Sequence, residues 1–162
     1  MILKNLNKNF ILNFFIVLTI FLSDRLSKIY IIHLDKQVFG NEILSSKFLN
    51  INLIWNDGIA FGLLSFEEDY LYNILTLIIL IIIFAITFMV VKADGIKKYL
   101  LLMILGGAIG NVFDRLFNRA VPDFIDFHIG NFHWFIFNVA DIFITLGVVF
   151  MILFEVTSNN ER

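Results

Sequence analysis

The sequence predicts an all-α membrane protein with four transmembrane helices. Of its 162 residues, 59% are hydrophobic and 16% are charged, whereas soluble domains average about 45–50% apolar and about 25% charged residues. Four apolar stretches are long enough to cross about 30 Å of hydrocarbon, which takes a helix of about 20 residues. The chain has no cysteine and shows no internal repeat. We therefore expect a single domain over residues 1–162, held together without disulfides.

The four helices are expected over residues 10–32, 70–91, 99–117 and 135–156. The first apolar run, "FILNFFIVLTIFL", continues through "SDRLSK" without a small-residue cleavage site, so it is interpreted as a helix rather than a signal peptide. The second, "YLYNILTLIILIIIFAITFMVV", carries no charge. The third and fourth are apolar stretches interrupted by acidic and amide side chains. These polar residues require a separate explanation.

The segment between the first two helices predicts a small extracytoplasmic β element. Its "KFLNINLIWN" alternates like a strand, and Asn56–Gly58 reads "NDG", which is typical of a tight turn. We expect this segment to rest on the membrane surface and cover the site, because several side chains are too apolar for a free loop in water: Leu53, Ile54, Trp55, Ile59 and Phe61. The alternative is that it only seals the helix bundle. The segment "NRAVPDFIDFHIGNFHW", between the third and fourth helices, is expected to be a short external loop.

The distribution of lysines predicts the orientation in the membrane. The N-terminal arm carries Lys4 and Lys8, and the connection between the second and third helices carries Lys92, Lys97 and Lys98. The first large loop is mainly acidic. By the positive-inside rule, both termini face the cytoplasm. The protein is thus expected to be a multi-pass membrane protein whose large first loop lies on the outer side.

Polar residues within the four helices collect near one end of the expected bundle. A carboxylate at the centre of a transmembrane helix costs about 2.5–3.5 kcal/mol on insertion scales, so these positions indicate a functional site. Asp141, six residues into its expected helix, would lie roughly 9 Å below the helix end at about 1.5 Å per residue. The helical polar residues that share this level are Asp24, Lys28, Asn73, Thr76, Asn111, Asp114, Arg115, Asn138 and Asp141.

Two acids, Asp123 and Asp141, are the candidate catalytic pair. Pro122 biases Val121 toward extended backbone, and a short extended segment could fold back and bring Asp123 toward Asp141. Two carboxylates in one site share a proton, so that one stays neutral while the other is charged. Such a pair can activate a water as general base and protonate a leaving amine as general acid. Peptide hydrolysis is the reaction that this pattern favours.

Other interpretations of these residues are open from the sequence. Asp141 could bond to Asn111 or Arg115 for structural reasons only, Asp123 could be a solvated loop acid, and Arg115 could snorkel to the interface. The spacing of Asp24 and Lys28 favours a local ion pair. Gly106 and Gly110 follow the small-xxx-small pattern of close helix packing.

Two further classes of function compete with a peptidase: a small proton-coupled transporter that uses Asp141 and Asp114, and a structural membrane subunit. A net charge of −2 argues against a nucleic-acid partner. The chain lacks a His-Glu-x-x-His motif, so no zinc site of that type is expected. We also expect no other metal and no cofactor. We expect Asp126 at the surface, and the three histidines, His33, His128 and His133, at the interface or in loops.

Five short motifs, in order, resemble those of the bacterial lipoprotein signal peptidase (signal peptidase II) family. Each motif is weak alone, but the five together span the chain from Asp24 to Asp141. They are "DRLSK" (Asp24–Lys28), "NDGIAFG" (Asn56–Gly62), "GGAIGNVFDR" (Gly106–Arg115), "VPDF" (Val121–Phe124) and "FNVAD" (Phe137–Asp141).

The resemblance implies an aspartic endopeptidase that removes signal peptides from diacylglyceryl-modified prolipoproteins, cleaving before the lipidated cysteine. The expected partners are these substrates, membrane lipid and globomycin-type inhibitors, and we expect a monomer. The resemblance also implies a multi-pass protein of the bacterial cytoplasmic (inner) membrane, with its active site facing outward. By motif, the catalytic pair is Asp123 and Asp141, and the substrate contacts are Asn56, Asn111 and Arg115. The residues that would orient the site are Asp24, Lys28, Asp114 and Asn138.

The chain departs from the family pattern at three positions. Arg25 stands where the family usually has Gln, Ile59 where a small residue is usual, and Pro122 where Val or Arg is common. None of the three is a presumed catalytic group. Ile59 bears on the shape of the outer loop and hence on inhibitor fit.

Overall fold

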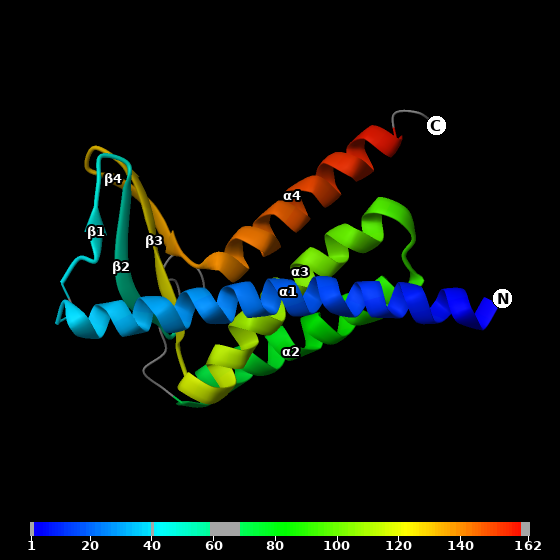
Figure 1. Ribbon diagram of the computed structural model, residues 1–162, viewed down its shortest axis with the longest axis horizontal. Coiled ribbons are helices and arrows are strands. Elements are labelled where there is room, and N and C mark those ends of the chain that lie inside the picture. Colours follow the sequence, from blue (N-terminus) through cyan, green and yellow to red (C-terminus); the bar gives the residue numbers. More distant parts are fainter. Residues whose placement is uncertain (1, 40, 59–68, 160–162) are drawn as a thin grey trace.

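A computed structural model describes residues 2–39, 41–58 and 69–159, which form four long helices and one small sheet (Figure 1). The helices are α1 (Ile2–Gln37), α2 (Asp69–Lys92), α3 (Gly95–Asn118) and α4 (Val139–Asn159). Each contains a stretch long and apolar enough to cross a membrane. The expectation of a four-helix membrane protein is therefore confirmed.

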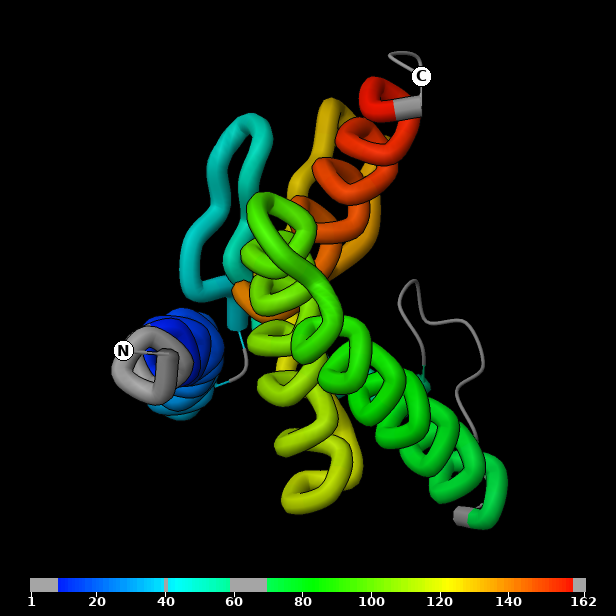
Figure 2. Tube along the Cα trace, turned by 90° about the vertical axis from the view of Figure 1, so that its right-hand side faces the viewer, coloured from blue at the N-terminus to red at the C-terminus, as the bar shows by residue number. Residues whose placement is uncertain are grey.

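The helix α3 is at the centre of the bundle and packs against each of the other three. In the end-on view, α1 stands to one side of the other helices (Figure 2). Three glycines allow the close approach of α1 and α4 to α3: a Cβ atom at Gly106 would lie 2.9 Å from the Ile20 side chain, and one at Gly107 would lie 2.5 Å from the Ala140 carbonyl oxygen. A Cβ at Gly110 would lie 2.6 Å from Asp24. The packing interpretation of Gly106 and Gly110 thus has a direct steric basis.

The β element is larger than the sequence predicts, because half of it comes from the segment before α4. Its four antiparallel strands lie in the order β1 (Leu44–Ser45), β2 (Leu49–Asn56), β3 (Val121–Ile129) and β4 (Phe132–Phe137). The alternating run in β2 is a strand, as expected. The expectation of a plain loop between the third and fourth helices is wrong: β3 pairs with β2 along its length, and a two-residue turn with Gly130 at φ 60° leads into β4. Such a turn is typical of tight hairpins.

The fourth helix begins at Val139 instead of at residue 135. Phe135–Phe137 belong to β4, and only Asn138 separates their apolar side chains from the hydrophobic run of α4, which is why hydropathy alone misplaces the boundary. Asp141 is consequently the third residue of its helix, closer to the helix end than the roughly 9 Å expected. The sheet lies at one end of the helices, and both chain termini lie at the other (Figure 1).

Candidate active site

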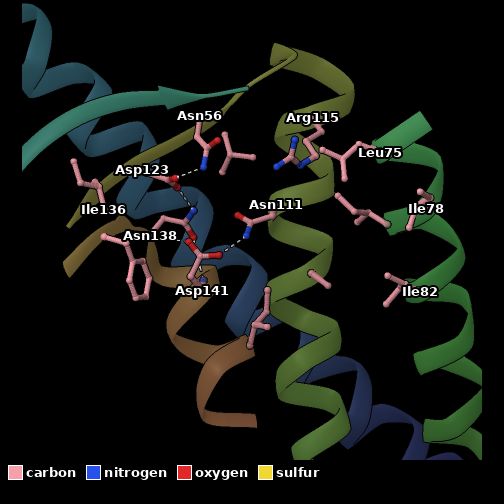
Figure 3. Close-up of a pocket in the computed structure, with 15 residues that line it drawn as sticks. Asn56, Leu75, Ile78, Ile82, Asn111, Arg115, Asp123, Ile136, Asn138 and Asp141 are labelled. Atoms are coloured by element: carbon pink, nitrogen blue, oxygen red, sulfur yellow. Dashed lines mark hydrogen bonds between the residues drawn. The ribbon is translucent and has the colours of Figure 1, made fainter. Parts of the chain in front are cut away.

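The two candidate catalytic acids line one cavity of about 380 Å³ between the sheet, α2, α3 and α4. Asp123 reaches it from β3 and Asp141 from the first turn of α4 (Figure 3). Asn111 and Arg115 line the same cavity from α3, and Asn56 from the end of β2. The structure therefore brings together the pair and the three expected substrate contacts, although they come from separate segments of the chain.

Asn138 connects the two acids. Its side-chain Nδ2 donates to Asp123 Oδ1 at 2.6 Å, and its backbone N–H donates to Asp141 Oδ2 at 3.1 Å. Its Oδ1 accepts the backbone N–H of Asp141 at 3.1 Å. The reciprocal bonds between positions 138 and 141 form a capping box at the start of α4. The polar residues of "FNVAD" therefore begin the helix, and the positive end of the helix dipole faces the Asp141 carboxylate.

Asp123 is almost fully buried and is held by two amides. In addition to the bond from Asn138, Asn56 Nδ2 donates to Asp123 Oδ2 at 2.9 Å. Burial raises the pKa of Asp123 to about 6, and the nearby charge of Asp141 also raises it, while the two amide hydrogen bonds lower it. A carboxyl group with this pKa can exchange a proton near neutral pH.

Asn56 stands at a tight turn after β2. The backbone N–H of Gly58 donates to Asn56 Oδ1 at 3.0 Å, which closes the turn expected from "NDG". The Asn56 amide at this turn contacts Asp123 directly. Ile59 and Phe61, the remainder of the expected cover over the site, lie outside the described residues.

Asn111 links Asp141 to a buried cation. Its Nδ2 donates to Asp141 Oδ1 at 2.7 Å, and its Oδ1 accepts from Lys28 Nζ at 2.9 Å. Because an ammonium can only donate, Lys28 fixes which end of the Asn111 amide faces Asp141. Asp141 thus has the hydrogen bond to Asn111 that a structural interpretation also predicts, but it lines the cavity as well.

Lys28 belongs to a buried charge cluster between α1 and α3. Its ammonium donates to Asp24 Oδ2 at 2.9 Å and to Asp114 Oδ2 at 2.8 Å, so all three of its N–H groups are used. The Arg25 guanidinium donates to Asp114 Oδ1 at 2.6 Å and also contacts Asp24. Asp24 Oδ1 accepts the Ala140 N–H at 3.1 Å, which ties α1 to the first turn of α4. The expected local ion pair of Asp24 and Lys28 is present, within this larger network.

Arg25 was singled out in the sequence only as a departure from the family pattern, yet it closes this cluster. Its guanidinium lies over the Phe113 ring, 5.0 Å from the centroid. Two acids and two bases then balance in charge. An Arg within a predicted membrane span is itself a signal of a buried partner, and that signal could have assigned Arg25 to this cluster from the sequence.

Arg115 is buried, so it does not snorkel to the membrane interface. Its guanidinium donates to the Gly58 carbonyl, and its Nη1 has no hydrogen-bond partner within the described residues. The ring of Tyr72 lies 5.8 Å from the guanidinium carbon, and the Tyr72 hydroxyl donates to the Arg115 backbone carbonyl at 3.0 Å. Tyr72 was missed from the sequence because nothing in the uncharged second helix distinguishes it.

Other expected polar residues lie away from the cavity. Asn73 is exposed, and Thr76 donates to its own helix at Tyr72 O, so α2 presents an apolar wall to the cavity. Asp126 is buried instead of exposed, because β3 is covered by its neighbours, and it contacts His133 Nδ1 at 2.8 Å. His128 and His133 lie on paired strands. Within the described part of the chain, no group of three or more His, Asp or Glu residues is arranged to hold a metal.

The transporter hypothesis required Asp141 and Asp114 to act together. Asp114 is fully buried, bonded to Lys28 and Arg25, and absent from the residues that line the cavity. The acid that faces Asp141 across the cavity is Asp123. The geometry therefore favours a two-carboxylate hydrolytic site over a proton-carrying path through Asp114.

Known proteins of one family are similar to this chain over most of its length. A family model described as signal peptidase (SPase) II matches residues 16–157. A lipoprotein signal peptidase of Pelagibacter ubique (strain HTCC1062) is 51% identical over 155 residues, which cover 96% of this chain and 93% of that protein. A lipoprotein signal peptidase of Aquifex aeolicus (strain VF5) is 40% identical over 140 residues, covering 85% of this chain and 81% of the relative.

Two solved structures described as bacterial membrane enzymes, both obtained by the in meso method, share the fold. One, at 2.3 Å resolution, has a TM-score of 0.76 and 26% identity, covering 93% of this chain and 90% of the other. The second, at 1.9 Å, has a TM-score of 0.70 and 30% identity, covering 87% and 90%. The match of the family model over most of the chain, together with these relatives, shows that the chain belongs to the signal peptidase II family of membrane peptidases.

Proposed function

We propose that the chain is an aspartic endopeptidase that removes signal peptides from diacylglyceryl-modified prolipoproteins and cleaves before the lipidated cysteine. The single observation that carries the proposal is that Asp123 and Asp141 line one cavity and are joined through Asn138. The lipoprotein signal peptidases among its relatives supply the substrate class. The protein would act in the bacterial inner membrane, as a multi-pass enzyme.

The two carboxyl groups divide the chemistry. Asp123, whose pKa burial raises to about 6, carries the shared proton, and Asp141 is the ionised base. Asp141 takes a proton from the attacking water while Asp123 donates its proton to the carbonyl oxygen of the scissile peptide bond. When the tetrahedral intermediate collapses, Asp141 gives its proton to the leaving amine, and Asp123 takes back the proton from the hydroxyl that becomes the product carbonyl, so the pair returns to its monoprotonated state.

Three side chains surround the pair with donors for the peptide backbone. Arg115 has a buried Nη1 with no partner among the described residues, which suits a substrate carbonyl. Asn111 is held by Lys28 beside Asp141, and Asn56 positions Asp123. The charge cluster of Asp24, Lys28 and Asp114, with Asn138 at the helix start, orients this set. The apolar wall from α2 suits a substrate that carries lipid.

The same geometry supports an orientation in the membrane. Both termini and the lysines of the α2–α3 connection lie at the end opposite the sheet, so the positive-inside rule places the sheet and the site on the outer side. The chain has no native cysteine, so Lys47→Cys in the sheet and Thr157→Cys at the other end provide unique labels. We expect a membrane-impermeant maleimide to label intact spheroplasts only at position 47. Labelling only at position 157 would reverse the orientation.

The function is tested with purified protein and a diacylglyceryl-modified prolipoprotein. Asp123→Asn and Asp141→Asn should each abolish cleavage while the protein stays folded, and the double variant should lose no more, because the two residues act as a unit. Globomycin-type inhibitors should block the parent protein. Normal turnover by either single variant would overturn the assignment of the pair. Equal cleavage of the unmodified prolipoprotein would overturn the substrate class.

A further inference from the structure

A second cavity lies at the opposite end of the molecule from the candidate active site. It has a volume of about 840 Å³, is formed by α1, α2 and α3, and shares no lining residue with the active-site cavity. In the end view, α1 stands apart from α2 (Figure 2). Neither the catalytic pair nor the charge cluster accounts for this cavity.

The cavity changes from apolar to polar over its depth. Its floor, the part farther from the α2–α3 connection along α1 and α3, is lined by Val17, Leu102 and Leu105, while the buried Val90 lies near the end of α2. Its mouth carries Asn9, Asn13, Asp94 and Lys98. The mouth lies where α2 ends at Lys92 and α3 begins at Gly95, which marks the boundary between hydrocarbon and headgroups for these two spans. The polarity of the cavity thus follows that of a lipid leaflet.

The polar groups at the mouth have no partners within the described residues. Lys98 makes no ion pair there, whereas the neighbouring Lys97 pairs with Glu155. Asn13 is only half-buried and, like Asn9, makes no side-chain hydrogen bond to the described residues. Asp94 precedes α3, yet its side chain does not cap the helix. The first N–H groups of α3 are therefore free of a side-chain acceptor at the same place as an unpaired ammonium.

These groups match one ligand chemistry. An ammonium, amide donors and an uncapped helix N-terminus together favour a phosphate, and basic pockets between transmembrane helices bind lipid headgroups. The unpaired carboxylate of Asp94 beside Lys98 makes the mouth neutral instead of cationic, which favours a headgroup with a positive charge next to its phosphate. The aliphatic floor provides the surface for an acyl chain.

We propose that this cavity binds one membrane phospholipid with an amine-bearing, zwitterionic headgroup. The lipid phosphate contacts Lys98 and the start of α3, the headgroup ammonium contacts Asp94, and one acyl chain covers Val17, Val90 and Leu105. The bound lipid fills the space between α1 and α2 at this end of the bundle. The proposal does not depend on the peptidase mechanism, and its test measures binding alone.

The test is native mass spectrometry of the full chain in detergent, titrated with phosphatidylethanolamine. We expect the parent protein to retain one lipid per chain. Retention should be about tenfold weaker in Lys98→Gln, which is the scale of one charge-assisted contact. It should not change in Lys92→Gln. Lys92 is the matched control, because it lies in the same connection but stacks over Phe88 and does not line the cavity. In Asp94→Asn, the preference for phosphatidylethanolamine over phosphatidylglycerol should disappear.

Three results would overturn the proposal. Equal weakening by Lys98→Gln and Lys92→Gln would indicate only diffuse attraction of lipid to a basic end. If the parent protein retained phosphatidylglycerol and phosphatidylethanolamine equally well, Asp94 would not select the headgroup. A lipid-free dimer that is disrupted by Lys98→Gln would show that a second copy of the chain occupies the cavity.

Discussion

Replacing Asn138 with serine should separate two functions of one fully buried side chain. Asn138 Oδ1 caps α4 by accepting the Asp141 N–H, and its Nδ2 donates to Asp123. Serine is a good N-cap residue, but its single hydroxyl replaces the capping oxygen only. Asn138→Ser therefore keeps the cap and removes the bond to Asp123, whereas Asn138→Ala removes both.

The magnitudes follow from these two contacts. A hydrogen bond to a charged group contributes about 1.5–3 kcal/mol, and the lower value applies because Asp123 keeps its bond from Asn56. An N-cap contributes about 1 kcal/mol. Asn138→Ser should thus lower the free energy of unfolding by about 1.5 kcal/mol, and Asn138→Ala by about 2.5 kcal/mol.

The same change should move the pH dependence of cleavage. The pKa of Asp123 is raised to about 6 by burial, and the hydrogen bond from Asn138 opposes that rise. Losing the bond destabilises the ionised carboxylate, so the pKa rises further, by about one unit at 1.36 kcal/mol per unit. If Asp123 carries the proton needed for catalysis, activity persists to higher pH, and the alkaline limb of the profile moves up by about one unit.

The assay is kcat/KM for a lipid-modified prolipoprotein, measured across the pH range on either side of that limb. Thr76→Val is the matched control, because it removes a buried hydrogen bond to Tyr72 O on α2 without changing a residue that lines the cavity. It should lower stability and leave the limb in place. An unmoved limb in Asn138→Ser, or a downward shift, would refute the proton assignment.

Three further predictions concern the rest of the site. Arg115→Lys should lower kcat/KM about tenfold or more, since an ammonium cannot contact both Gly58 O and a substrate carbonyl as the guanidinium fork can. Unchanged turnover would indicate that Arg115 has only a structural role. Gly107→Ala would place a Cβ 2.5 Å from the Ala140 carbonyl, so it should separate α3 from α4, lower the thermal midpoint and abolish cleavage, whereas the exposed Leu116→Ala should do neither. Because the pKa of Asp123 rises from 3.8 to about 6 on folding, the contribution of this group to stability should be fully present below pH 3.8 and be lost as pH rises through about 6, by up to about 3 kcal/mol. Thermal unfolding of the parent and Asp123→Asn across this window isolates that contribution, and an identical pH slope in both would contradict it.

Much of the helical architecture could be predicted from residue type alone. A run such as the uncharged second span can satisfy its backbone in hydrocarbon only as a helix, so length and hydropathy are sufficient to predict it. The candidate acids could also be recognised, because a carboxylate such as Asp141 in an apolar segment is costly without a function. The spacing of Asn138 and Asp141 is that of a capping box and indicates the correct start of the fourth helix. The apolar residues that precede Asn138 concealed this signal.

The sheet and the assembly of the site were decided only by the tertiary structure. Residues 121–137 become strands because β3 finds its partner in β2, and no local pattern encodes a pairing between segments so far apart in the chain. That pairing buries Asp123 and sets it opposite Asp141, which raises its pKa. The sequence determined by itself that acids and amides lie near one end of four membrane helices, since hydropathy is a property of each segment. The contacts between segments decide which of these side chains come together. Asn138 reaches Asp123, and Lys28 reaches Asn111, only when the bundle is packed.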